Sequence, residues 1–164
     1  MSESIHIQPG ISREEIYKTL LPQIRALIEG EPDLIANLAN VCSSLHIIFG
    51  FLWTGFYMRR GGDLVLGPFQ GPVACTRIPI GKGVCGTAAS GRKTINVPDV
   101  HLFPGHIACS PETKSEIVVP LVSNEKTVLI LDIDSEQPAY FTKTDEKYLA
   151  DVVDLIRVQH FPEA

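Results

Sequence analysis

The sequence predicts an α+β fold, in which helices cover one face of a mainly antiparallel sheet of about six strands. Two observations predict it. Hydrophobic residues recur at helical spacing at both ends of the chain, and the strand-like segments between them are joined by tight turns. With 164 residues, 45% of them hydrophobic, the chain is expected to form a single domain over residues 1–164, with residues 1–12 as an amino-terminal extension.

The first 50 residues predict two helices. The first is expected to begin after Ser12, because Ser12 and Glu15 have the spacing of a capping box. The second is expected to begin at Asp33 and to end at Gly50. Cys42 lies on the apolar stripe of this second helix, so we expect it to be a buried small hydrophobic residue.

Strand-like segments follow, at residues 51–58, 63–69, 75–80, 94–99, 116–122 and 127–134. A short helix bounded by glycines is expected over residues 81–92, and a final helix after the capping box of Thr142 and Asp145. Residues 98–114 are expected to form a loop. A loop of this length inside a compact domain is usually functional.

Charge and composition exclude several classes of protein. The net charge is -5, with acidic and basic residues mixed along the chain, so no basic stripe is available for nucleic acid. The amino terminus lacks the basic start and apolar run of a signal peptide, and no apolar run approaches the length of a membrane span. The expected compartment is the cytoplasm, where thiols stay reduced.

Three cysteines, Cys75, Cys85 and Cys109, lie within one 35-residue stretch. Cys75 and Cys109 fall at the edges of regular structure, where a thiol is reachable, and Cys85 lies near a helix start, whose dipole favours a thiolate. Such a group can supply a nucleophile, a resolving thiol and a relay, although three incidental cysteines explain the spacing equally well. No metal is expected, because no C-x-x-C pair occurs and the H-x4-H-x2-C spacing from His101 is not a common zinc pattern.

Two carboxylates, Asp132 and Asp134, end the last predicted strand, and alternation places them on one face of the sheet. Their neighbours in sequence are apolar, so we expect at least part of the pair to be poorly solvated. Glu116 opens the adjacent strand and can join them. Mutual repulsion raises the proton affinity of one such group, so the cluster can bind an ammonium group or donate a proton. An isolated D-x-D is more often a polar strand end.

Two aromatic residues, Trp53 and Tyr57, are expected on one face of their strand, with Gly55 leaving space between them. Such a wall suits an apolar ligand group. Ordinary core packing is the alternative.

Together these motifs resemble the GAF domain and, more narrowly, the free methionine-R-sulfoxide reductases, which are stand-alone GAF enzymes. The resemblance runs from about residue 15 to about residue 158 and includes W-x-G-F-Y at 53–57, E-I-V-V-P at 116–120, D-I-D-S at 132–135 and the cysteine spacing. Ligand-sensing GAF domains generally lack these three cysteines. The family fold implies that the short helix and the long loop cover a pocket on the face of the sheet opposite the terminal helices.

The resemblance implies thiol-dependent reduction of free L-methionine (R)-S-oxide to L-methionine. Cys109 matches the attacking thiol, Cys75 the thiol that resolves its sulfenic acid as an intramolecular disulfide, and Cys85 an accessory thiol. Thioredoxin is implied as the reductant, and no metal or organic cofactor is needed. The preference for the R epimer comes from the resemblance alone. A homodimer formed through the amino-terminal helices is a further expectation from GAF domains.

The resemblance also implies how the pocket binds its substrate. Glu116, Asp132 and Asp134 match the acidic pocket residues, with Glu116 and Asp134 expected to take part in catalysis. Trp53 matches the wall that meets the substrate methyl group, and Tyr57 is expected beside it. Carboxylates around the pocket favour a substrate with a free ammonium group, which peptide-bound methionine sulfoxide lacks.

Two non-enzymatic alternatives stay open. One is a GAF module that senses a small molecule such as a cyclic nucleotide, and the other is a thiol redox sensor without turnover. A sensing module normally accompanies an output domain, for which 164 residues leave no room, so the sequence favours the enzyme.

Overall fold

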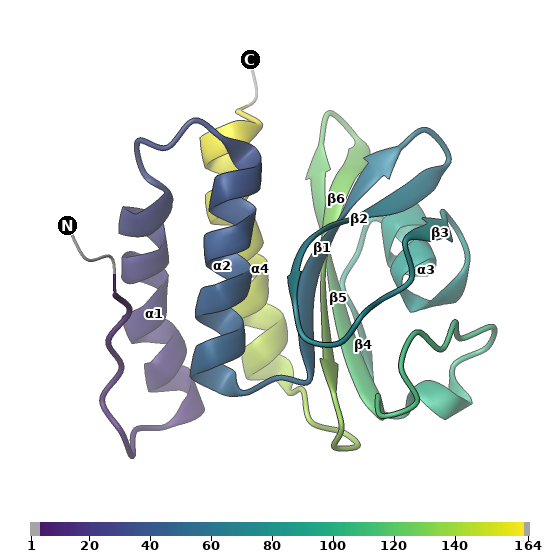
Figure 1. The fold of residues 1–164 in the computed structure, drawn as a ribbon, viewed down its shortest axis with the longest axis horizontal. Coiled ribbons are helices and arrows are strands. Elements are labelled where there is room, and N and C mark those ends of the chain that lie inside the picture. The colour runs from purple at the N-terminus through teal and green to yellow at the C-terminus, as the bar shows by residue number, and fades with distance from the viewer. Residues whose placement is uncertain (1–3, 163–164) are drawn as a thin grey trace.

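The computed structural model describes residues 4–162, which form a six-stranded sheet with helices on both faces (Figure 1). In chain order the elements are α1 (Arg13–Ile28), α2 (Leu34–Phe49), β1 (Trp53–Arg60), β2 (Asp63–Gln70), β3 (Arg77–Pro79), α3 (Gly83–Gly91), β4 (Ile95–Val97), the 3-10 helix η1 (Val100–Leu102), β5 (Ser115–Ser123), β6 (Lys126–Ser135) and α4 (Lys143–His160).

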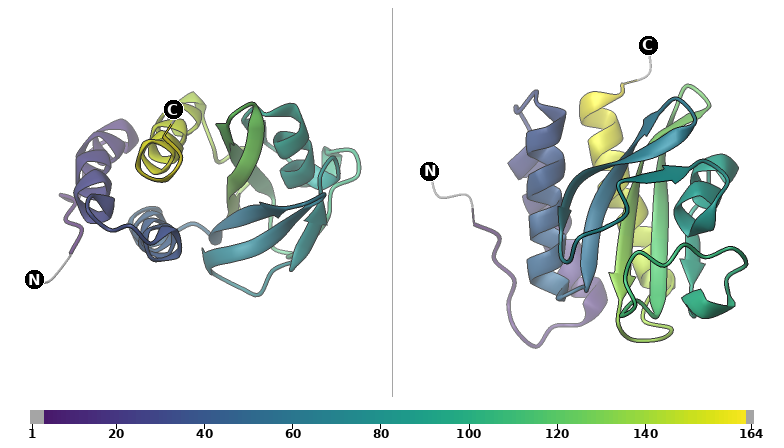
Figure 2. Two further views of the ribbon diagram at one scale, coloured as in Figure 1. Left: turned by 90° about the horizontal axis from the view of Figure 1, so that it is seen from above. Right: turned by 45° about the vertical axis from the view of Figure 1, so that its right-hand side comes forward.

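The strand order is β3-β2-β1-β6-β5-β4, and every neighbouring pair is antiparallel. Helices α2 and α4 lie against one face, and α1 packs on these two helices as an outer layer (Figure 2). Helix α3 lies on the opposite face, so the α+β prediction is confirmed. The placement of α1 in the outer layer could not be read from its hydrophobic pattern, because an apolar stripe does not say which surface it covers.

The helix boundaries follow from short-range side-chain contacts. Both predicted capping boxes are present, at the starts of α1 and α4. Asp33 accepts a hydrogen bond from the backbone N–H of Ala36 at the start of α2, and Gly50 ends that helix in the left-handed conformation. These residues satisfy backbone groups that a helix end leaves without intrahelical partners.

The core is divided by the sheet, because successive strand residues point to opposite faces. On the face covered by α2 and α4, β5 and β6 contribute Ile117, Val119, Leu121, Leu129, Leu131 and Ile133. The buried Cys42 of α2 belongs to this core, as predicted. On the other face a smaller cluster contains Trp53, Tyr57, Cys85, Val118 and Ile130. The strand side chains that point away from the main core therefore face α3 and the segment of residues 98–114.

The two connections around β5 differ from each other. The hairpin to β6 is tight, as predicted, with Asn124 and Glu125 both at positive φ. The preceding segment, residues 98–114, was expected to be a loop, but it contains η1. The backbone N–H of Val100 donates to the carbonyl oxygen of Lys114 at 2.9 Å and so closes the base of the excursion.

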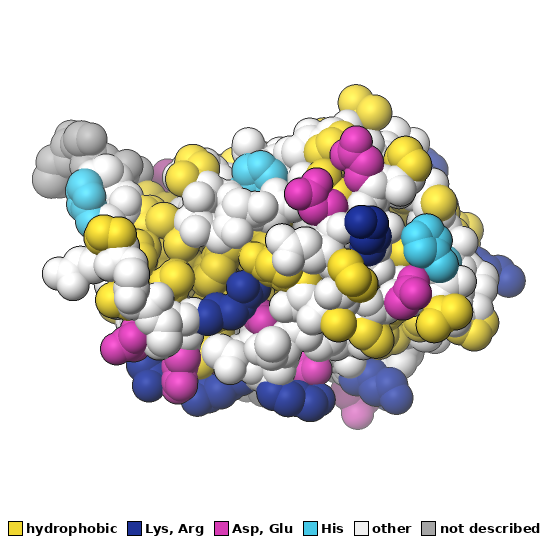
Figure 3. All heavy atoms as spheres, turned by 90° about the horizontal axis from the view of Figure 1, so that it is seen from below, with side chains coloured by type: hydrophobic (Ala, Val, Ile, Leu, Met, Phe, Trp, Pro, Cys, Tyr) yellow, Lys and Arg dark blue, Asp and Glu magenta, His cyan; other side chains and the backbone are white. Residues whose placement is uncertain are grey.

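Charged side chains of both signs are interspersed on the face seen from below in Figure 3. Among the described residues, no helix is both long enough and apolar enough to cross a membrane.

Candidate active site

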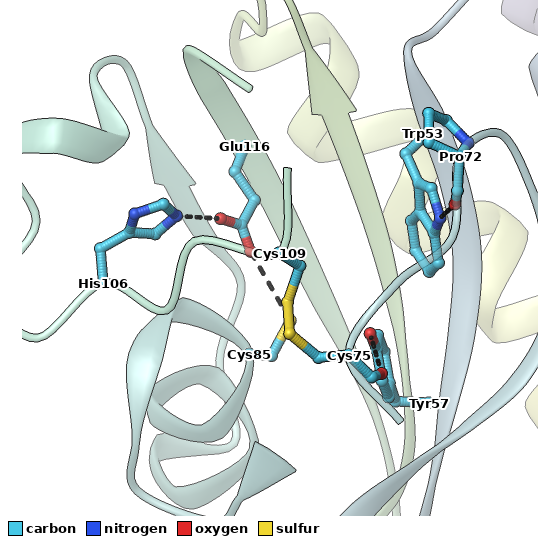
Figure 4. The surroundings of a disulfide bond; sticks show 8 residues. All are labelled: Trp53, Tyr57, Pro72, Cys75, Cys85, His106, Cys109 and Glu116. Carbon is cyan, nitrogen blue, oxygen red and sulfur yellow. Dashed lines mark hydrogen bonds and ion pairs between the residues drawn. A yellow bond between two sulfur atoms is a disulfide. The ribbon is translucent and has the colours of Figure 1, made fainter. Parts of the chain in front are cut away.

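A disulfide joins Cys75, just before β3, to Cys109, in the loop between η1 and β5. Their Cα atoms are 5.5 Å apart, inside the usual range for this bond. It links two segments 34 residues apart in the sequence, and it lies on the face of the sheet that carries α3 (Figure 4). This is the pairing that the family resemblance implied.

The three carboxyl groups gather beneath this disulfide. Asp134 is aligned with Trp53 on β1 and with Glu116 on β5, so one row across three strands contains an aromatic ring and two acids. Asp132 lies two residues along β6 on the same face. Glu116 and Asp132 are each only 6% exposed, and both line the same cavity as Asp134 and Cys109. The predicted clustering is confirmed.

Burial raises the proton affinity of all three acids. It raises the pKa of Glu116 and Asp134 well above the ordinary range, and the negative charge of Asp132 raises both further. Burial also raises the pKa of Asp132, to about 6. The sequence argument attributed this burial to the apolar neighbours in β6. Those neighbours point to the opposite face, so α3 and the loop over the cavity cause the desolvation instead.

Cys85 does not have the expected exposed and reactive thiol. It is buried within α3, and its Sγ donates to Glu116 Oε1 at 3.6 Å. Burial, followed by the charges of Asp132 and Glu116, raises the pKa of this thiol well above its ordinary value. The prediction of a thiolate was wrong because the dipole of a short helix is small compared with desolvation beside carboxyl groups.

The aromatic pair lies as predicted, with the rings of Trp53 and Tyr57 stacked 5.9 Å apart. The space over Gly55 is not open, however, because a Cβ there would collide with the Trp53 indole. Both rings also hold the segment that carries Cys75. Trp53 Nε1 donates to the Pro72 carbonyl oxygen at 3.0 Å, and the Tyr57 hydroxyl donates to the Cys75 carbonyl oxygen at 2.9 Å (Figure 4).

His106 is a cavity residue that sequence reasoning considered only as a zinc ligand. Its Nε2 lies 3.8 Å from Glu116 Oε2, and its pKa is lowered by burial and by the nearby His101. The sequence signal that could have identified it as a cavity residue is its position three residues before Cys109. Among the described residues, Cys85, Glu116 and Asp132 place possible metal-ligand atoms within 4.8 Å of one another. We assign no metal to them, since the thiol already donates to Glu116.

The cavity between these groups has a volume of about 40 Å³. One water molecule needs about 10–15 Å³. With the disulfide formed, the cavity therefore has room for a few water molecules but not for an amino acid.

Comparisons with known proteins agree with this geometry. The GAF domain family matches residues 33–159. Free methionine-R-sulfoxide reductase of Saccharomyces cerevisiae is 42% identical over 164 residues, covering 94% of this chain and 91% of the yeast protein. Its counterpart in Escherichia coli is 44% identical over 144 residues, covering 87% of each chain. The chain belongs to the free methionine-R-sulfoxide reductase family.

A solved structure supports this membership. Free methionine-R-sulfoxide reductase from Neisseria meningitidis, in complex with its substrate, superposes with a TM-score of 0.93 at 43% identity, covering 96% of this chain and 95% of the other. The GAF fold and the resemblance to free methionine-R-sulfoxide reductases are thus confirmed. The roles of the individual thiols and acids remain predictions, as do the domain limits and the amino-terminal extension.

Proposed function

We propose that this chain reduces free L-methionine (R)-S-oxide to L-methionine with electrons from its own thiols. The observation that carries the proposal is a cysteine pair, Cys75 and Cys109, bonded beside the buried carboxyl groups of Glu116 and Asp132 and the half-buried Asp134. A redox-active thiol pair alone fits many proteins. Protonated acids beside it fit a reaction in which an oxygen must be protonated while sulfur is attacked. The yeast and Neisseria relatives are named for this reaction.

Cys109 is the attacking thiol in this proposal. Its thiolate attacks the electrophilic sulfoxide sulfur while a carboxylic acid protonates the sulfoxide oxygen. Two electrons pass from the Cys109 sulfur to the substrate sulfur, and the oxygen is transferred to Cys109. Methionine leaves, and Cys109 becomes a sulfenic acid.

The acid is Glu116 or Asp134, since burial keeps the pKa of both well above the ordinary range. A group of this kind is still protonated near neutral pH and has a proton to donate. We favour Asp134, because it is aligned with Trp53 across the β1–β6 pair and is thus close to the expected position of the substrate methyl group.

Asp132 has the features of a receptor for the substrate ammonium group. Its Oδ1 atom is buried and has no hydrogen-bond partner within the described protein, so an arriving cation has a free acceptor. Ionised Asp132 then pairs with the ammonium group while the Trp53 ring contacts the methyl group. Peptide-bound methionine sulfoxide has no free ammonium group and is excluded.

The catalytic cycle closes through Cys75. Its thiol condenses with the Cys109 sulfenic acid, which releases water and forms the observed disulfide. Thioredoxin then restores both thiols by exchange, which suits a cytoplasmic location. Because the cavity of the disulfide form is about 40 Å³, the loop carrying Cys109 must move away before the next substrate enters. The homodimer through the amino-terminal helices stays part of the proposal.

Coupled turnover tests the function. NADPH consumption is measured with thioredoxin, thioredoxin reductase and each epimer of methionine sulfoxide, both free and within a peptide. Sustained consumption with the free R epimer is expected, with none for the peptide. Consumption that stops after about one equivalent would instead indicate a redox sensor, because a sensor has no substrate that reoxidises it.

A further inference from the structure

Each half of the disulfide follows an exposed aliphatic residue. The two segments read Val73-Ala74-Cys75 and Ile107-Ala108-Cys109, so the aliphatic side chain precedes its cysteine by two positions in both. Val73 is 88% exposed and Ile107 is 37% exposed. Both line the cavity beside the disulfide. Among the described large hydrophobic residues Val73 has the highest exposure, so its side chain does not contribute to the hydrophobic core.

The two segments that contain these residues lack formal charge, although Arg77 and Glu112 directly follow them. Residues 71–76 and 103–111 contain no Asp, Glu, Lys or Arg, although charged residues make up 20% of the whole chain. The titratable side chain beside the cysteines in these segments is His106, which is turned toward Glu116. Depletion of charge around exposed apolar residues is characteristic of the centre of a protein–protein interface.

In the disulfide form, which is the form the partner meets, both segments contact the scaffold. A Cβ added to Gly83, the first residue of α3, would lie 3.1 Å from Ile107 Cγ1, so the isoleucine packs closely on the helix start. On the other side, the hydrogen bonds from Trp53 and Tyr57 hold the backbone at Pro72 and Cys75. A surface held in place in this way loses little conformational entropy when a partner binds.

We propose that Val73 and Ile107 form an apolar docking rim for the protein dithiol that reduces the Cys75–Cys109 disulfide. This inference rests on the proposed function. The partner is a protein with two adjacent thiols bordered by uncharged, apolar surface, and the thiols must reach the disulfide between the two aliphatic residues. Transient redox complexes belong to the smallest class of interfaces, below about 1,200 Å², so a rim of two aliphatic residues and their neighbours is sufficient.

The exchange has two steps. A thiolate of the partner attacks one sulfur of the disulfide, which gives a mixed disulfide and releases the other cysteine as a thiolate. The second thiol of the partner then attacks the mixed disulfide. The partner leaves with its own disulfide, and two electrons and two protons have passed to Cys75 and Cys109.

Val73→Asp tests the rim, because this side chain is exposed and its replacement leaves the core intact. Turnover of free methionine sulfoxide is driven either by thioredoxin, kept reduced with its reductase and NADPH, or by dithiothreitol, which needs no docking surface. We expect kcat/KM for thioredoxin to fall about tenfold or more relative to the dithiothreitol-driven rate of the same variant, the effect of losing one central interface contact. Val158→Asp is the matched control, since Val158 is 59% exposed on α4, and it should change neither rate.

Three results would contradict the proposed docking role of Val73 and Ile107. An equal loss with both reductants, with a raised KM for methionine sulfoxide, would assign Val73 to substrate binding. A gain for Val73→Lys opposite to the loss for Val73→Asp would indicate charge steering rather than apolar contact. Unchanged thioredoxin kinetics for Val73→Asp would remove the docking role altogether. In contrast, absence of dithiothreitol-driven turnover in the unaltered protein would overturn the proposed function, and the rim with it.

Discussion

Asp132→Asn is expected to make the protein more stable at neutral pH while removing a group that binds substrate. Asp132 is 6% exposed, and burial raises its pKa from 3.8 to about 6. The unfolded chain keeps the ordinary value. A carboxyl group that is harder to ionise in the folded protein than in the unfolded chain opposes folding once the pH exceeds the unfolded pKa.

The magnitude follows from this pKa difference. Between about pH 4 and about pH 6 the folded protein binds more protons than the unfolded chain, so the free energy of unfolding falls as the pH rises. The shift from 3.8 to about 6 corresponds to about 3 kcal/mol, at about 1.4 kcal/mol per pKa unit. An asparagine side chain does not titrate, so the variant avoids this loss. Removing the charge of Asp132 also lowers the pKa of Glu116 and Asp134, which acts in the same direction.

Urea unfolding of the disulfide form from about pH 4 to about pH 8 measures the effect. The buried amide that Asp132→Asn introduces has its own hydrogen-bonding cost of about 1–3 kcal/mol, but this offset does not vary with pH. The diagnostic quantity is therefore the change in the difference between the variant and the unaltered protein across the pH range. Asp151→Asn, which replaces an exposed carboxylate on α4, is the control and should give a curve parallel to that of the unaltered protein.

A difference between Asp132→Asn and the unaltered protein that is the same at about pH 4 and about pH 7 would refute the reasoning. It would mean that Asp132 is ionised in the folded protein over this range and that the cavity is better solvated than its burial indicates.

Three further predictions concern the reaction. Asp134→Asn should slow single-turnover release of methionine by about 10²-fold or more, the usual scale for general-acid catalysis, and a change of only a few fold would exclude Asp134 as the proton donor or its electrostatic support. N-acetyl methionine sulfoxide should be a very poor substrate, because acetylation removes the ammonium charge, and comparable kcat/KM values for both compounds would give the carboxyl groups another role. Cys109→Ser should form no methionine, whereas Cys75→Ser should release about one equivalent and retain a sulfenic acid on Cys109 in mass spectra. A stoichiometric burst from Cys109→Ser would reverse the assignment of the attacking thiol.

The elements of the fold were predictable because the interactions that define them are short in sequence. The capping pair of Thr142 and Asp145 spans three residues, and the turn at Asn124 and Glu125 joins adjacent strands. Alternation along β6 likewise predicts that Asp132 and Asp134 share one face. In each case the information lies within a few residues of the feature that it predicts.

The protonation, exposure and contacts of individual side chains were predicted less accurately, and Cys85 is the clearest case. Its local position at the start of a short helix predicts a thiolate, but its surroundings include Glu116 and Asp132, which are 31 and 47 residues away in the sequence. Gly55 shows the same effect at shorter range, because the rotamer of Trp53 determines whether the space beside the glycine is open. His106 was missed as a neighbour of Glu116 for a related reason, since nothing local to either residue indicates the contact.

The sequence by itself therefore determined the α+β architecture, which of the candidate site residues share a face of their strand and, through its family resemblance, which cysteines are bonded. Only the tertiary structure decided that the Cys85 thiol stays protonated, that the carboxyl groups are desolvated by α3 and the loop, and that the cavity of the disulfide form has a volume of about 40 Å³. The physical reason is that proton affinity and access depend on every atom within several ångströms, and those atoms come from segments that only the folded chain brings together.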